Sequence, residues 1–311
     1  MRVGFAGAGK VGFALGRYLH EQGICIQGFF SRTHSHAQHA AALTSSTAYE
    51  TLPALCRDCD VVLLTVSDGV IAELAHGIAA SGIDLTGKTA CHLSGSLPSA
   101  VLAPARDAGA AVCSAHPLAA FSDELMPTAP LAGAFFTLEG DAPAVHALEA
   151  LLDRCGNPHR AIDPAAKTAY HAAAVFLSNL VVGLADEGYR ILERCGFTAR
   201  EARAATASLF TRNAQAIAEH GPNAALTGPI ERGDARTVAR HLDALHALAA
   251  AQPGAGSPAA DARRAPGPRG PDARTVRIYA ELSQALCDLA ADNHPDRDYA
   301  DIRTILGKES Q

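Results

Sequence analysis

The sequence lacks two features that would assign a chain to a large class at once. It has no uninterrupted run of about 18 apolar residues, the length needed for a membrane-spanning helix. It has no excess of positive charge, since its formal net charge is −6, and this argues against a nucleic-acid partner. Its first residues have the pattern of a core strand, unlike a signal peptide. We therefore expect a cytoplasmic protein with no membrane or nucleic-acid partner.

Aromatic residues are also few, at 5% of the chain, whereas 48% of the residues are apolar. This composition is ordinary for an alanine-rich soluble enzyme. The length of 311 residues is enough for two domains and a large core.

Complete metal-ligand sets are missing too. The eight cysteines are scattered, and most lie in apolar segments, where a reduced thiol acts as a small hydrophobe. Cys56-x-x-Cys59 could be a redox or metal half-site, but it has no second pair and precedes a buried strand. His34, His36 and His39 have no interleaved carboxylate or thiolate, so they are expected beside Arg32 or facing solvent. We expect no metal.

A glycine-rich turn opens the chain. Residues 3–6 form a short apolar run typical of a buried parallel strand, and Gly7-x-Gly9-x-x-Gly12 follows at once. Residues 10–22 then have helical periodicity. In such a turn Gly7 permits the bend, Gly9 lets a pyrophosphate approach the backbone, and Gly12 lets the helix pack on the strand. The free N–H groups of the helix N-terminus attract the anion, so this context predicts a dinucleotide site.

The end of the second strand, residues 24–31, bears on which dinucleotide binds. A free ribose 2′-hydroxyl usually meets Asp or Glu here, whereas a 2′-phosphate needs cations. The sequence has Ser31-Arg32-Thr33 and no acid until Glu50. Since Arg32 offers a permanently charged fork of donors, NADP(H) is favoured over NAD(H). The alternative is a solvated loop arginine.

The rest of the first half alternates strands and helices. Further strands are expected at residues 60–65, 88–93, 110–115, 133–138 and 160–162, with helices at 35–43, from 69 to 81, at 97–108 and at 142–155. This rhythm predicts a doubly wound, parallel α/β sheet over residues 1–162.

Polar residues stop three of these strands at their carboxyl ends, where open α/β sheets bind ligands. They are Ser67-Asp68, Ser94-Gly95-Ser96 and His116. The residues expected to bind the cofactor are Gly7, Ala8, Gly9, Lys10, Val11, Gly12, Ser31, Arg32, Thr33, Val66, Ser67 and Asp68. We expect Ser94, Gly95, Ser96 and His116 to contact a small-molecule substrate, although polar loops are common without such a role.

After residue 162 the pattern becomes all-α, and we place the domain boundary between Ile162 and Asp163. Helices are expected at residues 165–195, 198–220, 234–251 and 275–292. Residues 252–272 are rich in Pro, Gly and Ala, so they are expected to be a disordered insertion in the second domain, 163–311.

The first of these helices carries polar residues on an apolar background. Lys167, His171 and Ser178 lie within about 40° of one another around a helix, and Asn179 joins them only if the helix bends. In carbonyl reduction the developing alkoxide needs a proton or a cation. We predict Lys167 as this acid and His171 as a residue that orients the substrate or tunes the lysine. The alternative is that Lys167 extends to solvent and His171 is a core histidine.

A second polar cluster runs from Thr227 to Asp234. Asp234 is expected to cap the next helix. Arg232 could clamp a substrate carboxylate or pair with a neighbouring acid, and the sequence leaves both open. Ser178, Asn179 and Arg232 complete the predicted substrate contacts.

Five motifs together resemble a known family. They are GxGxxG, His92-Leu-Ser-Gly-Ser96, His116-Pro-Leu, Lys167-x-x-Tyr170-His171-x-Ala-Ala and Thr227-Gly-Pro-x-x-Arg232-Gly-Asp234. Their order is similar to that of Rossmann-like proteins with a C-terminal helical domain of formerly unknown function, within the 6-phosphogluconate-dehydrogenase-like superfamily. The resemblance covers the chain except residues 252–272.

This resemblance implies an NADP(H)-dependent oxidoreductase. Some members resemble the alternative type of ketopantoate reductase, so the best single expectation is reduction of 2-dehydropantoate to pantoate. Lys167 matches the position of the superfamily's usual acid, while the Asn that follows it four residues later is His171 here. The family also implies a homodimer formed through the helical domain.

Two other functions remain open. A prephenate/arogenate dehydrogenase or a pyrroline-carboxylate reductase is one, because His116-Pro-Leu also resembles a stretch of the former. A non-catalytic NADP-binding sensor is the other, and it would bind NADPH without turning over any carbonyl.

Overall fold

The computed structural model describes residues 1–121, 123, 125–251 and 270–309. The chain forms two compact units, Met1–Leu177 and Ser178–Gln311. The first unit therefore extends beyond the predicted boundary at Ile162/Asp163, because the helix after that point packs its lysine into the first unit. Most of the predicted insertion, residues 252–269, lies outside the described residues.

The first unit is built on an eight-stranded sheet with the order β3-β2-β1-β4-β5-β6-β7-β8. The strands are β1 (Arg2–Ala6), β2 (Cys25–Phe30), β3 (Thr47–Tyr49), β4 (Val61–Leu64), β5 (Thr89–His92), β6 (Ala111–Pro117), β7 (Phe136–Gly140) and β8 (His159–Ala161). The strand order reverses between β1 and β4, which is where such folds bind their ligands. The predicted doubly wound sheet is confirmed.

Two details of the sheet differ from the prediction. Strand β3 has three residues and only one fully buried side chain, Tyr49, so it carries no apolar run. Strand β7 pairs antiparallel with β6. Among the described residues of the connection between them, the short helix α6 (Ala129–Ala132) is the one helix, and it is too short for a crossover.

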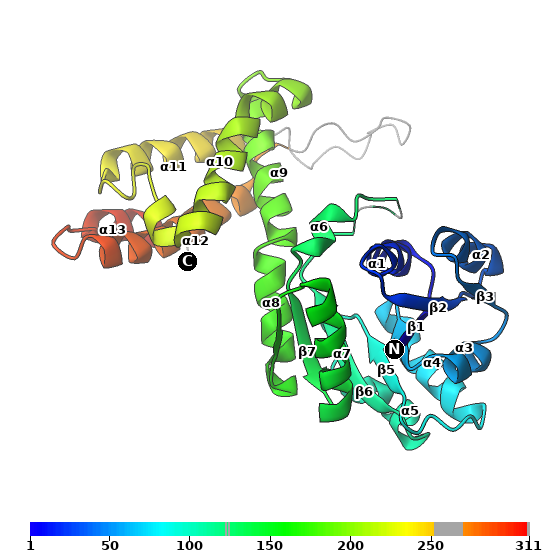
Figure 1. Cartoon of the computed structure of the whole chain (residues 1–311). Helices are drawn as coiled ribbons and strands as arrows, with labels where there is room; N and C mark the ends of the chain where they lie inside the picture. The colour runs from blue at the N-terminus through cyan, green and yellow to red at the C-terminus, as the bar shows by residue number, and fades with distance from the viewer. Residues whose placement is uncertain (122, 124, 252–269, 310–311) are drawn as a thin grey trace, which may run out of the picture. The chain divides into compact units, whose positions relative to one another are not determined.

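Helices cover both faces of the sheet (Figure 1). On β4, Val61 and Leu63 join one buried cluster, while Val62 and Leu64 join the other, as alternation along a strand requires. The first cluster includes side chains of α1 (Lys10–Glu21), α2 (His34–Leu43) and α7 (Ala142–Cys155). The second includes side chains of α3 (Leu52–Asp58), α4 (Asp68–Ala80), the 3₁₀ turn η1 (Ser99–Leu102) and α5 (Ala103–Asp107). This packing leaves the carboxyl ends of the strands to the connecting loops.

The prediction of one long helix from residue 165 to 195 was wrong. After the 3₁₀ turn η2 (Pro164–Ala166), helix α8 spans Lys167–Phe176 and helix α9 spans Asn179–Arg194. Ser178 lies between them with φ −133° and ψ −83°, outside the helical region. Neither Pro nor Gly marks this break. The Ser-Asn pair is its only local signal, since both residues favour helix caps.

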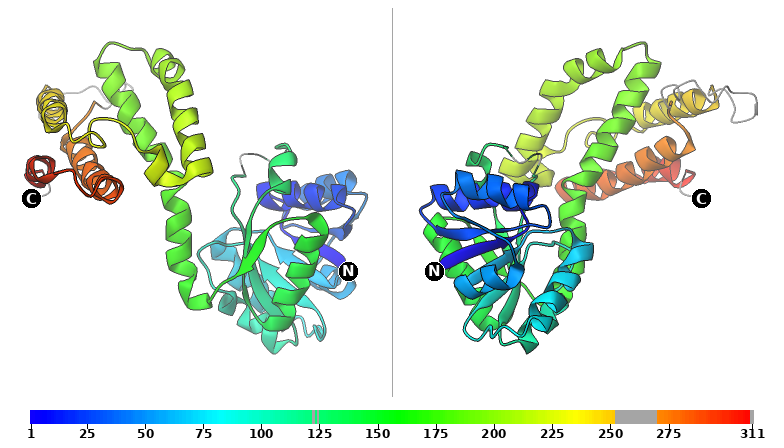
Figure 2. Two further views of the ribbon diagram at one scale, coloured as in Figure 1. Left: turned by 60° about the vertical axis from the view of Figure 1, so that its left-hand side comes forward. Right: turned by 90° about the vertical axis from the view of Figure 1, so that its right-hand side faces the viewer.

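The second unit is all-α, as predicted (Figure 2). It contains α9, α10 (Ala199–Ala225), α11 (Ala235–Ala250), α12 (Ala273–Asn293) and α13 (Ala300–Gly307), around a core that includes Val238, Leu242 and Ile302. Helix α10 is interrupted at Gly221, whose φ of 80° is left-handed, with Pro222 next to it. Asp234 caps α11 by accepting a hydrogen bond from the Thr237 N–H at 3.0 Å, which confirms its predicted role.

One stretch, Pro164–Arg194, is long and apolar enough to cross a membrane by length and composition alone. None of its most apolar window, with a mean hydropathy of 1.4, is buried. Helices of soluble proteins pass the same test, so this is weak evidence for a membrane span. It shows that this stretch presents apolar side chains at the surface.

Candidate active site

The glycine-rich turn has the geometry that dinucleotide binding needs. Gly7 has φ +124°, and a Cβ there would lie 2.6 Å from the Thr65 carbonyl oxygen. At Gly12 a Cβ would lie 2.2 Å from the Gly7 carbonyl oxygen. A Cβ at Gly9 would meet no atom within 4 Å, so the space over this residue is open. Gly9 is also the N-cap of α1 and makes no side-chain cap, so this helix end fits a pyrophosphate.

A pocket of about 470 Å³ begins at this turn. It extends over the carboxyl ends of β4, β5 and β6 to helix α8, and it has the size of a small-ligand site. Its lining residues are Gly9, Lys10, Val11, Thr65, Val66, Ser67, Asp68, Leu93, Ser94, Gly95, Ser96, His116, Pro117, Ala119, Phe121 and His171. Most predicted cofactor and substrate residues of the first unit therefore meet in one place. Gly7, Ala8 and Gly12 are buried and are not among its lining residues.

Ser31, Arg32 and Thr33 lie outside this pocket, between β2 and α2. Arg32 and Thr33 are exposed. Glu50, the first acid after them, pairs with His34, whose Nε2 lies 3.1 Å from its Oε1. Since β2 is the neighbour of β1, Arg32 stands on the side of the turn where an adenosine ribose binds in this fold.

Asp68 ties two loops of the pocket together. Its Oδ2 accepts hydrogen bonds from the Ser94 hydroxyl at 3.0 Å and the Ser96 hydroxyl at 2.8 Å. Ser94 Oγ also accepts from the N–H groups of Ser96 and Leu97. Both serines therefore shape the loop after β5, and Asp68 brings a carboxylate to the pocket wall.

His92 holds the start of that loop. Its Nδ1 accepts from the Ser94 N–H at 3.2 Å, and its Nε2 lies 3.3 Å from the Pro98 carbonyl oxygen. Burial, reinforced by the nearby Lys167 charge, lowers the pKa of His92 to about 4. A neutral imidazole satisfies both contacts, so His92 is a structural residue that the sequence motif contained.

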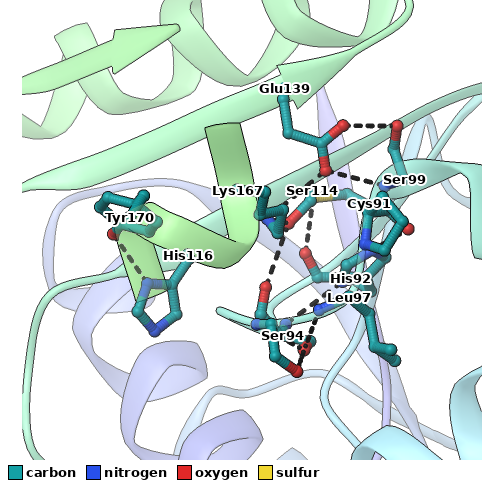
Figure 3. A network of polar contacts seen from close by, with 12 residues as sticks. Cys91, His92, Ser94, Leu97, Ser99, Ser114, His116, Glu139, Lys167 and Tyr170 are labelled. Atoms are coloured by element: carbon teal, nitrogen blue, oxygen red, sulfur yellow. Dashed lines mark hydrogen bonds and ion pairs between the residues drawn. The ribbon is translucent and has the colours of Figure 1, made fainter. Parts of the chain in front are cut away.

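Lys167 does not line the pocket. Its side chain is 1% exposed, and its Nζ lies 3.4 Å from Oε1 of Glu139, which is fully buried (Figure 3). Lys167 also donates a short hydrogen bond to the Ser114 hydroxyl. The other Glu139 contacts come from the N–H and the hydroxyl of Ser99, each at 2.7 Å. Burial lowers the pKa of Lys167, while Glu139 opposes this shift.

This arrangement differs from both interpretations of Lys167 based on the sequence, which were a catalytic acid at the substrate and a lysine extended to solvent. The ammonium group neither extends to solvent nor faces the pocket, because a buried carboxylate on β7 pairs with it. No motif pointed to Glu139, which lies between Leu138 and Gly140 at the end of β7. The role of Lys167 as the catalytic acid stays a prediction.

The polar residues that face the pocket from this side are histidines. His116 Nδ1 lies 2.8 Å from the Tyr170 hydroxyl (Figure 3), and the His116 and His171 rings meet edge to face at 5.8 Å. Burial, followed by the Lys167 and His171 charges, lowers the pKa of His116 to about 4, although Asp68 opposes the shift. Nδ1 of His171 is buried and has no hydrogen-bond partner among the described residues. Buried polar atoms are normally paired, so this nitrogen marks a place for a ligand atom.

Gly95 is what allows the two histidines to approach the loop. A Cβ at this residue would lie 2.5 Å from His171 Nδ1 and 2.7 Å from His116 Nε2. The predicted substrate residues Gly95, His116 and His171 are therefore grouped at one point of the pocket.

The remaining predicted substrate residues belong to the second unit. The Ser178 hydroxyl lies 3.1 Å from Asn179 Oδ1, and both residues are exposed. Arg232 is exposed too. Hydrogen bonds from Thr237 are the main cause of the lowered pKa of Asp234. The Arg232 charge lowers this pKa by a smaller amount.

No group of three His, Cys, Asp or Glu side chains that could hold a metal ion occurs within the described ranges. Cys56 and Cys59 are buried, and burial raises their thiol pKa values to about 11 and about 12. The His39 ring stacks on Phe13 at 5.1 Å. These residues have packing roles in the first unit.

Family models match two consecutive parts of the chain. A Rossmann-like domain model matches residues 1–117, and the model of a domain of unknown function, DUF2520, matches residues 134–255. No protein of curated function matches the sequence.

Solved structures resemble the chain over nearly its whole length. Protein TM1727 from Thermotoga maritima has a TM-score of 0.69 at 24% identity, covering 93% of this chain and 98% of its own. The "putative NADP oxidoreductase BF3122" from Bacteroides fragilis has a TM-score of 0.66 at 20% identity, with 92% and 98% covered. A reductive aminase from Aspergillus terreus in complex with NADPH and ethyl-5-oxohexanoate has 0.57 at 16% identity, with 99% and 92% covered. At these identities the likeness establishes a shared fold, and the chain carries a Rossmann-like domain followed by a DUF2520 domain.

Proposed function

We propose that this protein is an NADP(H)-dependent reductase of a small carbonyl or imine compound. The observation that carries the proposal is the single pocket that joins the open space over Gly9 to the His116 and His171 rings. Bound NADPH would supply a hydride to the substrate carbon. The N-terminus of α1 would hold its pyrophosphate, and the histidines would face the heteroatom on which negative charge develops.

The preference for NADP(H) rests on Arg32. This exposed arginine follows β2, and its guanidinium suits a 2′-phosphate, for which NAD(H) has no counterpart. Replacing Arg32 by Ala should weaken NADPH binding about 10-fold or more and leave NADH binding unchanged, as followed by cofactor fluorescence. The matched control is Arg57→Ala, which removes another exposed arginine of the first unit. Equal losses for both cofactors would contradict the NADP(H) assignment.

The first candidate substrate is a small 2-oxo acid, with 2-dehydropantoate as the specific case. It is supported by the family resemblance and by the polar wall of His116, His171 and Ser96. The sequence predicts Arg232, a residue of the second unit, as the partner of the substrate carboxylate, and this role stays a prediction. The Arg232→Ala variant should then raise KM and leave NADPH affinity unchanged.

One observation favours an imine as the second candidate. Among the lining residues that the structure describes, Asp68 is the one acid and Lys10 the one permanent cation. A carboxylate at the wall repels a 2-oxo acid and attracts a positively charged iminium group. One of the solved structures that share this fold is named a reductive aminase, in complex with NADPH.

The experiment that tests the function measures NADPH consumption with 2-dehydropantoate and, in parallel, with a cyclic imine. Turnover of the oxo acid alone supports the first candidate, and turnover of the imine alone supports the second. An Asp68→Asn variant should impair imine reduction more than oxo-acid reduction. Tight NADPH binding with neither substrate reduced would contradict a reductase of these compounds and favour the cofactor-sensor alternative.

We also propose that the protein is a homodimer formed through the second unit. The support is the set of large apolar side chains exposed on α9 and α10, which are Leu180, Val182, Leu184, Leu209, Phe210 and Ile217. Val182 and Leu209 are each 71% exposed, so Val182→Glu and Leu209→Glu should give monomers in light scattering. The control is Leu43→Glu, an exposed leucine of the first unit. A wild-type monomer in the same measurement would contradict the dimer.

A further inference from the structure

Tyr170 has no role in the function proposed above, but it is hydrogen-bonded to His116, which lines the pocket. It lies on α8, one turn after Lys167, and its hydroxyl contacts His116 Nδ1 at 2.8 Å (Figure 3). The two rings meet edge to face, with centroids 5.7 Å apart. The Tyr170 oxygen also bonds to the Thr137 hydroxyl on β7. Thr137 pairs with His116 across the β6–β7 ladder, so all three residues are held by regular structure.

The chemistry of the pair decides which atom donates. A phenol is a stronger acid than a neutral imidazole N–H, and an imidazole nitrogen is a stronger base than a phenol oxygen. Burial raises the pKa of Tyr170, so its phenol is protonated at neutral pH. The favoured arrangement is therefore donation from Tyr170 to His116 Nδ1, with the Thr137 hydroxyl donating to the Tyr170 oxygen.

This arrangement fixes where His116 carries its proton. A neutral imidazole has one N–H, so a ring that accepts at Nδ1 must carry its hydrogen on Nε2. Nε2 is the nitrogen beside Gly95, where a Cβ would lie 2.7 Å from it and 2.5 Å from His171 Nδ1. The N–H of His116 and Nδ1 of His171, which has no hydrogen-bond partner in the part of the chain that the structure describes, thus flank the same point of the pocket.

We propose that Tyr170 is a positioning residue that holds His116 as the Nε2–H tautomer, so that this N–H donates a hydrogen bond to the substrate heteroatom beside His171. The inference rests on the reductase function proposed above. His116 gives a hydrogen bond and keeps its proton, so no group transfer is assigned to it. A neutral donor of this kind stabilises the charge that develops on an oxygen or nitrogen during reduction.

The first test reads the tautomer directly and needs no turnover. In the full-length protein, long-range proton–nitrogen NMR of the histidine rings, with His116 assigned from a His116→Asn variant, should show an Nε2–H imidazole. In Tyr170→Phe both tautomers should appear, because the fold is kept and the donor is gone. Wild-type His116 with its proton on Nδ1 would overturn the inference whatever the kinetics show.

The second test uses a matched control within the chain. His241 and Tyr279 form the same type of pair in the second unit. His241 Nδ1 lies 2.9 Å from the Tyr279 hydroxyl, and the two ring planes make an angle of 82°. A hydrogen bond with Ser283 acts on Tyr279, as the one with Thr137 acts on Tyr170. Tyr170→Phe should lower kcat/KM about 5- to 50-fold, mainly through kcat, with NADPH affinity kept. Tyr279→Phe should leave both values unchanged.

The outcomes separate this inference from the proposed function. If the tautomer is as described but both Tyr→Phe variants keep the wild-type kcat/KM, the positioning role is overturned. If the wild type reduces no carbonyl and no imine, the proposed function fails while the NMR result still decides the tautomer. A Thr137→Val variant gives a further check, since it should shift the His116 tautomer less than Tyr170→Phe does.

Discussion

Two polar clusters of the first unit share helix α8 and strands β6 and β7, but they differ in one respect. In the Lys167–Glu139 cluster the charges are fully buried and paired, and Ser99 and Ser114 supply further hydrogen bonds. In the His116–Tyr170–His171 cluster the rings reach the pocket, and one buried nitrogen has no partner among the described residues.

This contrast distinguishes a structural ion pair from a site that can bind a ligand. A satisfied buried cluster stabilises the fold, and its loss is measured as unfolding free energy. A cluster with an unpaired buried polar atom costs free energy until a ligand supplies the missing hydrogen bond. Removing such a cluster should lower activity more than stability. Variants in the two clusters should therefore affect different measurements.

The largest effect is expected for Lys167→Met. Removing one partner leaves the Glu139 carboxylate buried without its counter-charge, which should lower the unfolding free energy by about 3–5 kcal/mol in urea denaturation. The double variant Lys167→Met/Glu139→Gln removes both charges and should recover part of this loss. A Lys167→Met protein that is as stable as the wild type but has no activity would instead support Lys167 as the catalytic acid.

The next largest effect is expected for His116→Asn, and it should be on activity. Losing a donor to the developing charge should lower kcat/KM about 10²- to 10³-fold in a steady-state assay. The unfolding free energy should fall far less than in Lys167→Met, because His116 is half-buried and carries no paired charge. Equal losses of stability in the two variants would remove the contrast between the clusters.

A smaller effect is expected for Gly95→Ala. The added methyl group would lie 2.5 Å from His171 Nδ1 and 2.7 Å from His116 Nε2, so the rings must move apart. Overpacking of this kind costs about 1–3 kcal/mol, and we expect about a 10-fold loss of kcat/KM. The control is Gly133→Ala, where a Cβ meets no atom within 4 Å and φ is −103°. Normal activity of Gly95→Ala would show that the rings need not lie against the loop.

The fold and much of the pocket could be predicted from the sequence, because local patterns determine them. The spacing of the glycines from Gly7 to Gly12 predicts the dinucleotide-binding turn. The residues after β4, β5 and β6 lie close together because the carboxyl ends of these parallel strands are at one edge of the sheet. Gly95 and His116 were predicted at the site for this reason.

What could not be predicted depends on partners far apart in the sequence. Helical spacing places Lys167 and His171 on one stripe, but only the tertiary structure shows that Glu139 on β7 captures the lysine. The contact between Tyr170 and His116 depends on packing in the same way, since the two residues lie far apart in the sequence. The local sequence pattern predicts on which face of a helix or strand a residue lies. Tertiary packing determines which residue it contacts there.

The smallest predicted effect connects the two clusters through charge. The groups that act on His116 are its burial, then Lys167 and His171, which lower its pKa to about 4, and Asp68, which raises it. Since the unfolded pKa is near 6.5, the unfolded chain binds more protons between pH 6.5 and 4, so stability should fall as pH falls through this window. The Lys167→Met/Glu139→Gln variant removes the lysine charge and should raise the His116 pKa, which histidine NMR titration can follow, and make this decline shallower. An unchanged pKa would mean that burial and His171 suffice to keep His116 neutral and that the ion pair has no electrostatic influence on the pocket.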